Sequence, residues 1–132
     1  MQNRNLKKEE MTVLVVDDFS AMRGKMIDML SELGFTKLEE AEDGEKALSR
    51  IKRGGVDLVI SDWNMPDMMG MELLSAIRAS RAASDLLFMM VTAESERKSA
   101  VEALDAGANE VVVKPVSSAV MRSKLEEMLN QR

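Results

Sequence analysis

The chain has 132 residues, the length of one ordinary domain, and its 45% hydrophobic and 31% charged residues are typical of a soluble globular protein. The net charge of −5 argues against binding of nucleic acids through their phosphates as the main activity. Cysteine and histidine are absent, which excludes disulfides, thiolate and imidazole metal ligands, and catalysis by either side chain. No apolar run approaches the roughly 18 residues of a membrane span, so we expect no membrane segment and a cytoplasmic location.

The first half of the chain alternates short apolar runs with amphipathic segments. Residues 1–10 are polar, and we expect them to fray. Ser20 is a plausible N-cap for the first helix, and Gly34 fits the position just after its end. The elements expected here are a strand at 11–16, a helix at 20–33, a strand at 38–41, a helix at 45–53 and a strand at 56–62.

The second half continues the alternation with helices at 67–79, at 94–106 and from Ser117 onward, and with strands at 86–91 and 111–113. In the helix at 94–106 we expect Val101 and Leu104 to face inward, and in the last helix Val120 belongs to the expected apolar stripe. The 13 methionines suit core packing, although the cluster at 65–71 could instead form an adaptable surface.

Five strand–helix pairs with short connections are typical of an α/β protein. A strand that is apolar almost throughout, as 56–61 is, is expected to be buried on both faces of a parallel sheet. The sequence therefore predicts a doubly wound five-stranded parallel sheet flanked by five helices.

Polar side chains follow four of the expected strands. They are Asp17 and Asp18 after the first strand, Asp62 after the third, Thr92 after the fourth and Lys114 after the fifth. Because the carboxyl ends of parallel strands share one edge of the sheet, we expect these side chains to lie close together. Three adjacent carboxylates repel one another unless a cation intervenes, and oxygen ligands favour a hard divalent ion, which we expect to be Mg²⁺.

The same residues predict phosphoryl-transfer chemistry. Lys114 supplies a positive charge for anionic oxygens and Thr92 supplies a hydroxyl donor. Asp62, at the end of the central strand, is the best candidate for a carboxylate nucleophile that forms an aspartyl phosphate. Each residue alone has an ordinary structural explanation, such as a turn, a helix cap or a solvated strand end. The joint pattern at four successive strand ends is what favours a functional site.

These stretches resemble the receiver domain of two-component response regulators, and in particular its single-domain chemotaxis members. The resemblance covers essentially the whole chain. It rests on the segments LVVDDFS at 14–20, EAEDG at 40–44, ISDWNMP at 60–66, MVTAE at 90–94 and VVKP at 112–115.

The resemblance implies a flavodoxin-like sheet with strand order 2-1-3-4-5 and a single receiver domain over residues 1–132 without an output domain. Asp62 resembles the phosphoacceptor. Asp18, Asp62 and the backbone carbonyl of Asn64 resemble direct Mg²⁺ ligands, and Asp17 a ligand through water. Lys114 is expected to bind the phosphoryl group, and its bond to Pro115 matches a cis peptide.

Other positions resemble those that tune the switch. Thr92 is expected to follow the phosphoryl group on activation, and Asn64 and Glu94 match positions that set the rate of dephosphorylation. The implied donor is a phosphohistidine on a histidine kinase of the CheA type. The chain is then a phosphoacceptor that catalyses its own phosphorylation and dephosphorylation, and neither a kinase nor a conventional enzyme. The implied state is a monomer, with a flagellar motor switch protein and a phosphatase as further candidate partners.

The chain departs from the family at its output face. Val111 stands where an aromatic switch residue is usual, and Val116 also replaces an aromatic. Glu96 and Glu127 stand where lysines are common. Two outputs therefore stay open: a signal to the flagellar motor, or a paralogue that serves as a phosphate sink or regulates another partner.

Two other classes fit the sequence less well. A flavin- or nucleotide-binding module on the same fold needs a phosphate-binding loop after the first strand, where this chain has Asp17 and Asp18. An aspartate-nucleophile phosphatase needs a second Asp two residues after its nucleophile, and the residue two positions after Asp18 is Ser20.

Overall fold

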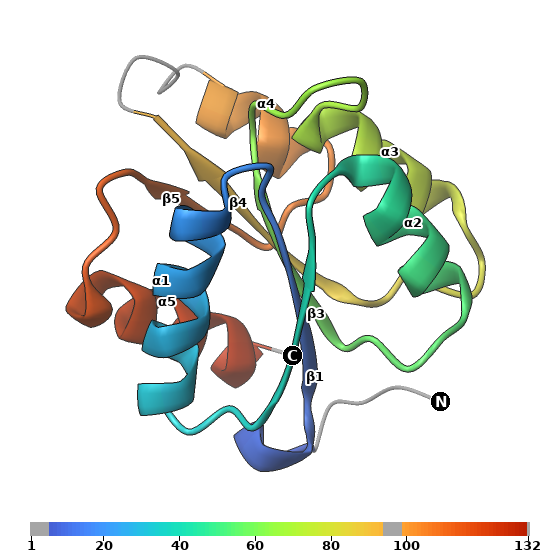
Figure 1. The fold of residues 1–132 in the computed structure, drawn as a ribbon. Helices are drawn as coiled ribbons and strands as arrows, with labels where there is room; N and C mark the ends of the chain where they lie inside the picture. Colours follow the sequence, from blue (N-terminus) through green and yellow to red (C-terminus); the bar gives the residue numbers. More distant parts are fainter. Residues whose placement is uncertain (1–5, 94–98, 132) are drawn as a thin grey trace.

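In the computed structural model of the chain, residues 6–93 and 99–131 are described, and they contain one parallel sheet. Its strand order is β2-β1-β3-β4-β5, which confirms the order expected from the resemblance. Figure 1 shows the strands running in the same direction, with their carboxyl ends toward the top of the view. The strands are β1 (Thr12–Val16), β2 (Lys37–Ala41), β3 (Leu58–Asp62), β4 (Leu87–Thr92) and β5 (Glu110–Val113).

Helices cover both faces of the sheet. Figure 1 shows α1 and α5 on one side and α2 and α3 on the other, with α4 near the carboxyl ends of the strands. None of the helices in the described ranges has the length and hydropathy needed to cross a lipid bilayer. The helices are α1 (Ser20–Glu32), α2 (Gly44–Lys52), α3 (Gly70–Ala79), α4 (Ser99–Asp105) and α5 (Ser118–Gln131), preceded by a 3-10 turn, η1 (Lys8–Glu10).

The predicted helix boundaries hold where a local stop or start signal is strong. Gly34 has a φ of 107° after α1, and the following N–H, that of Phe35, donates to the carbonyl of Leu30. Ser117 accepts the N–H of Val120 through its hydroxyl at the start of α5, as a helix cap does.

Two helices begin differently from the prediction. Ser20 is the first residue of α1 and makes no cap; Phe19 occupies the cap position. The third helix begins at Gly70 and not at 67, because Asp67 has a φ of 67° and the N–H of Met68 donates to the carbonyl of Pro66 in a tight turn. A left-handed residue interrupts a helix, so 67–69 belong to the loop after β3.

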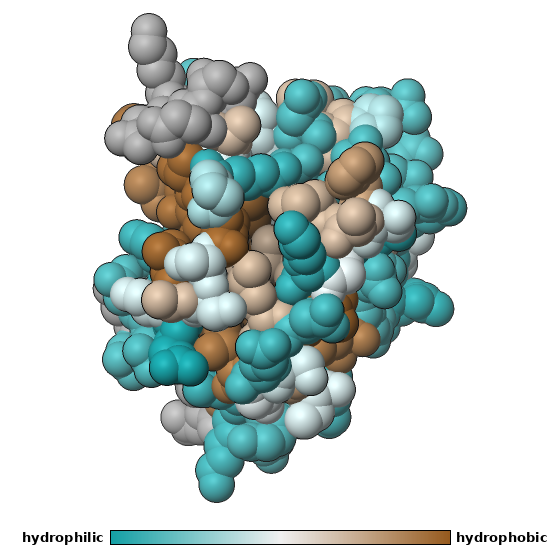
Figure 2. All heavy atoms as spheres, turned by 60° about the vertical axis from the view of Figure 1, so that its left-hand side comes forward, coloured by the Kyte–Doolittle hydropathy of each residue, from teal (hydrophilic) through white to brown (hydrophobic). Residues whose placement is uncertain are grey.

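The expectation for the fourth helix is wrong in its orientation. Val101 and Leu104 are 63% and 49% exposed, and Ala103 is the residue buried against the sheet. Both sets of positions fit a helical period, and small side chains let a helix approach the sheet more closely than large ones. Val120 of α5 is also exposed, at 43%. On the face of the molecule drawn in Figure 2, hydrophobic residues gather toward the upper left. Residues 94–98, predicted as the start of this helix, lie outside the described residues.

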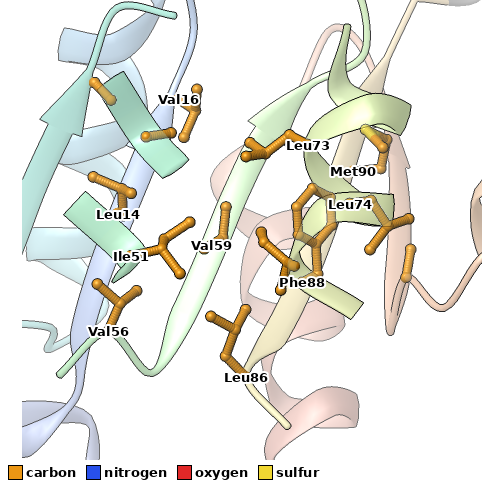
Figure 3. Packing of buried hydrophobic residues seen from close by; sticks show 14 of the residues in the cluster. Leu14, Val16, Ile51, Val56, Val59, Leu73, Leu74, Leu86, Phe88 and Met90 are labelled. Carbon is orange, nitrogen blue, oxygen red and sulfur yellow. The ribbon is translucent and has the colours of Figure 1, made fainter. Parts of the chain in front are cut away.

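The core on the side of α2, α3 and α4 is built from interdigitated side chains of both layers (Figure 3). Leu73, Leu74 and Ile77 of α3 are 0% exposed and pack over the middle of the sheet, where Val59 and Phe88 lie. All five residues of β3 are buried, which explains the nearly continuous apolar run that predicted it.

The core on the side of α1 and α5 relies more on methionine. Met26 of α1 and Met121 and Met128 of α5 pack against the opposite face of the same strands. Met65 is also buried, at 3% exposure, and packs in the other core, so the methionines serve largely as core residues as predicted.

The N-terminal stretch is more ordered than expected. Lys8–Glu10 form the turn η1, where fraying was predicted. The ammonium of Lys8 donates to the carbonyl of Leu33 at 3.3 Å, and the hydroxyl of Thr36 donates to the carbonyl of Glu9 at 2.9 Å. Contacts with the end of α1 and the start of β2 therefore hold the second half of this segment.

Arg78 ties together the ends of three elements on the edge opposite the strand carboxyl ends. Its guanidinium donates to the carbonyls of Gly107, Ser84 and Leu86 at 2.6–3.0 Å and to the side-chain oxygen of Asn109 at 3.0 Å. The same oxygen of Asn109 accepts the backbone N–H of Phe88 at 2.8 Å. One side chain thus satisfies backbone groups in the loops before β4 and β5.

We predict that Arg78→Ala lowers the free energy of unfolding by about 2–4 kcal/mol, because it leaves several partly buried carbonyls without a donor. Urea denaturation measures this loss. Arg81→Ala is the matched control, since Arg81 is exposed in the loop that follows α3 and removal of its charge is expected to cost less than about 0.5 kcal/mol. Equal losses in the two variants would contradict the prediction.

Candidate functional site

The carboxyl ends of β1, β3, β4 and β5 bring the predicted polar residues to one edge of the sheet. The backbone ladder continues one residue past the strands: Asp17 donates its N–H to Ala41, and Lys114 donates its N–H to Thr92 at 2.7 Å. Trp63, directly after Asp62, donates its N–H to Val91 at 2.8 Å. Backbone hydrogen bonds to neighbouring strands therefore fix the positions from which these side chains extend.

Three carboxylates meet at this edge. Oxygen atoms of Asp17, Asp18 and Asp62 lie within 4.8 Å of one another. Asp17 and Asp62 are 7% and 8% exposed, whereas Asp18 is exposed. Two of the three carboxylates in the cluster are thus buried, and the third, Asp18, is in contact with solvent.

Burial and mutual repulsion make this cluster electrostatically unfavourable on its own. Burial raises the pKa of Asp17, and the charges of Asp62 and Asp18 raise it further. The N–H of Phe19, which donates to the Asp17 carboxylate at 2.9 Å, and the charge of Lys114 act in the opposite direction but do not cancel the rise in pKa. The site favours additional positive charge.

Lys114 provides part of that charge. Its ammonium lies 3.0 Å from an oxygen of Asp62, and its side chain is 28% exposed. The peptide bond from Lys114 to Pro115 is cis, as the resemblance implied. Thr92, the last residue of β4, is completely buried beside this pair of strand ends, and its hydroxyl lies 3.4 Å from the carbonyl of Ala93. The ammonium of Lys114 is therefore in direct contact with Asp62, the predicted nucleophile.

The residues expected to tune the switch lie in different parts of the structure. Asn64 is exposed in the loop after β3, two residues from Asp62. Val111 is half-buried in β5 and packs against the core on the α3 side, while Val116 packs against the core on the α5 side. Glu94 and Glu96 lie outside the described residues.

The donor set fits Mg²⁺. The three clustered side chains offer only carboxylate oxygens, the ligands that this ion prefers, and these oxygens lie within 4.8 Å of one another. The exposure of Asp18 leaves the cluster open to water, which Mg²⁺ retains in most protein sites.

Two residues in contact with the site were missed by the sequence analysis. Gly70, at the start of α3, donates its N–H to Trp63, and a β-carbon there would lie 2.4 Å from the backbone oxygen of Asp62. Arg23 donates to the backbone carbonyl of Asp17 at 2.7 Å. A glycine inside the helix expected at 67–79 was a signal for the first, and the second had only the unusual place of a cation near a helix N-terminus.

Comparison with known families identifies the family to which the chain belongs. The model of the response regulator receiver domain matches residues 13–126, which include every strand except the first residue of β1. The chain belongs to the response regulator receiver family. The clustered aspartates and Lys114 lie together at the carboxyl edge of the sheet of this receiver domain.

Similar proteins agree with the assignment. The chain is 42% identical to chemotaxis protein CheY-3 of Vibrio cholerae over 98% of its own length and 95% of the relative. It is 44% identical to the chemotaxis protein CheY of Pseudomonas aeruginosa over 92% of its length and 98% of the relative. Among solved structures, the chemotaxis response regulator CheY4 of Vibrio cholerae superposes with a TM-score of 0.81 at 30% identity, over 89% of this chain and 98% of that one.

We predict that Gly70→Ala lowers the free energy of unfolding by about 1–3 kcal/mol, because the new methyl group overlaps the backbone of Asp62 and the sulfur of Met90. Chemical denaturation tests this. Gly24→Ala is the control, since Gly24 is exposed within α1 with nothing within 4 Å of the new atom. That variant is expected to gain about 0.5–1 kcal/mol from helix propensity, so a gain in both would contradict the close contact at Gly70.

Proposed function

We propose that this receiver domain is a cytoplasmic chemotaxis response regulator that accepts a phosphoryl group on Asp62 from a histidine kinase of the CheA type. The observation that carries the proposal is the grouping of Asp62 with two further carboxylates and the ammonium of Lys114 at one sheet edge. The chemotaxis names of the relatives at 42–44% identity support the pathway.

In the proposed transfer, an oxygen of Asp62 attacks the phosphorus of a phosphohistidine. A phosphorus–oxygen bond forms, the phosphorus–nitrogen bond breaks, and the imidazole nitrogen leaves with the electron pair. Lys114 already contacts Asp62 and turns from the carboxylate to an oxygen of the incoming phosphoryl group. The chain supplies this arrangement itself, so phosphorylation is catalysed by the acceptor and the protein is not a kinase.

Asp18, Asp62 and the backbone carbonyl of Asn64 are the proposed direct ligands of Mg²⁺, with Asp17 acting through water. When bound, the ion supplies positive charge that offsets both the clustered carboxylates and the oxygens of the phosphoryl group. Asp17 is almost fully buried, and its side chain already accepts the N–H of Phe19, which suits an indirect, orienting role.

The switch is proposed to run from Thr92 toward β5. Thr92 is completely buried and joined to Lys114 through the backbone, so a bond from its hydroxyl to the phosphoryl group would alter the end of β4 beside β5. Val111, on β5, has no ring that could follow this movement. Asn64 and Glu94 are the proposed positions that set the rate of dephosphorylation.

A second output is favoured by the charges on the face formed by α4, β5 and α5. Lys124 lies 3.3 Å from Glu110 and 3.9 Å from Glu127, so its charge is locally compensated. Together with Val111, this favours a partner other than the flagellar motor switch, or a role as a phosphate sink that receives phosphoryl groups without passing on a signal.

Trp63 is the only tryptophan and is half-buried next to Asp62, so its fluorescence reports on the site. We predict a saturable change in this fluorescence on adding Mg²⁺ and a further change on adding beryllium fluoride, which mimics an aspartyl phosphate. Asp62→Asn is expected to lose the second change and to weaken the first, because it removes a carboxylate from the cluster.

Folding of each protein is checked by circular dichroism before the titration. A folded, unchanged protein that responds to neither addition would overturn the proposed metal-assisted acceptor site. A beryllium fluoride response that persists in Asp62→Asn would show that another residue carries the phosphoryl group.

The output can be tested with a peptide from a flagellar motor switch protein. We predict that combining Val111→Tyr with Glu127→Lys tightens binding of the beryllium fluoride form by about tenfold or more, since an aromatic anchor and a favourable charge are restored. Fluorescence anisotropy measures the affinity. Glu32→Lys makes the same charge change at the end of α1 and is the control. Tight binding by the unchanged protein, with no gain in the double variant, would favour the motor output.

A further inference from the structure

Arg23 occupies an electrostatically unfavourable position. It lies in the first turn of α1, where no acidic residue is present and where the partial positive charge of the helix terminus repels a cation. Its side chain is nevertheless only 15% exposed and does not extend into water. The contacts that hold it there must compensate for this repulsion.

Those contacts connect β2, the strand at the edge of the sheet, to the loop between β1 and α1. This loop carries Asp17 and Asp18 and is called the acidic loop. One terminal nitrogen of the guanidinium donates to the backbone carbonyl of Asp17 at 2.7 Å. The Nε atom donates to the carboxylate of Glu40 on β2 at 2.9 Å. Glu40 directly precedes Ala41, whose carbonyl accepts the N–H of Asp17 at 3.2 Å. The end of β2 therefore holds Asp17 twice, once directly and once through Arg23.

Asp17 is restrained at every one of its polar groups except one carboxylate oxygen. Its N–H is held by β2, its carbonyl by Arg23, and one carboxylate oxygen by the N–H of Phe19 at 2.9 Å. The carbonyl of Phe19 in turn accepts the N–H of Arg23 at 3.1 Å, which closes the first turn of the helix. Protein contacts alone thus restrain the loop between β1 and α1.

We infer that Arg23 is a positioning residue for the metal site, which holds the loop between β1 and α1 so that Asp17 and Asp18 face Asp62. The inference rests on the proposed function, because it concerns the affinity of the same acidic cluster for Mg²⁺. It assigns part of that affinity to a side chain that touches neither the ion nor the phosphoryl group, as outer-shell partners do in metal sites.

Arg50 offers a matched comparison within the same chain. Its guanidinium donates to both oxygens of Glu39, the neighbour of Glu40 on β2, and to the carbonyl of Gly54. It therefore ties α2 to the edge strand as Arg23 ties α1, but none of its hydrogen bonds reaches the acidic loop. Substituting each arginine by methionine removes a comparable ion pair and keeps most of the apolar stem.

The test is a titration of the full chain with Mg²⁺ alone, followed by the fluorescence of Trp63, together with a thermal melt of each variant. Arg23→Met is expected to weaken Mg²⁺ binding by about tenfold, whereas Arg50→Met leaves it unchanged even if both lower the melting temperature. Arg23→Lys keeps the charge but cannot donate to two acceptors as a planar fork does, and is expected to fall between the unchanged protein and Arg23→Met.

The outcomes separate the inference from the proposal beneath it. Equal Mg²⁺ affinity in the unchanged protein and in the folded Arg23 variants would overturn the inference and leave the acceptor site intact. Equal weakening by Arg50→Met would also overturn it, because general loss of the edge strand would then explain the effect. An unchanged protein without a Mg²⁺ response would overturn the proposed function and the inference with it.

Discussion

Repulsion among three neighbouring carboxylates is the constraint on which the carboxyl edge of the sheet depends. Oxygens of Asp17, Asp18 and Asp62 lie within 4.8 Å of one another, and two of these side chains are almost fully buried. Burial raises the pKa of Asp17, the charges of Asp62 and Asp18 raise it further, and the nearby ammonium of Lys114 acts in the opposite direction. The chain tolerates the arrangement because backbone hydrogen bonds from β2 and β4 hold the loops in place. An edge held in this way suits the proposed binding of a divalent cation together with a phosphoryl group.

Much of this architecture was predictable because strands and their ends carry strong local signals. Nearly continuous apolar runs marked the buried strands, and an abrupt change to Asp, Thr or Lys marked the carboxyl edge. The strand order came from the resemblance, since the alternation of elements leaves several topologies possible. The placement of Asp17, Asp18 and Asp62 in one cluster agrees with the prediction.

The errors have a different physical origin. A helical period in α4 fits an inward Leu104 as well as an inward Ala103, and only the space above the sheet distinguishes them. Arg78 and Arg23 donate largely to backbone carbonyls, which every residue possesses, and their side-chain partners Asn109 and Glu40 are distant in sequence, so these contacts leave no local signal. Contacts of this kind become visible only when the fold brings distant loops together.

The two helices next to the site on the α2–α4 side differ sharply in how they are anchored. α3 places Leu73, Leu74 and Ile77 completely inside the core, and each such side chain contributes about 1.5–3 kcal/mol on burial. The described part of α4 has Ala103 as its one fully buried side chain, and an alanine methyl group contributes only about 1 kcal/mol. Displacing α3 would therefore expose more buried apolar surface than displacing the described part of α4. The helix that follows Asp62, the proposed phosphoacceptor, is therefore the more deeply anchored of the two, and a rearrangement after the proposed phosphorylation would meet less resistance from buried apolar surface at α4 than at α3.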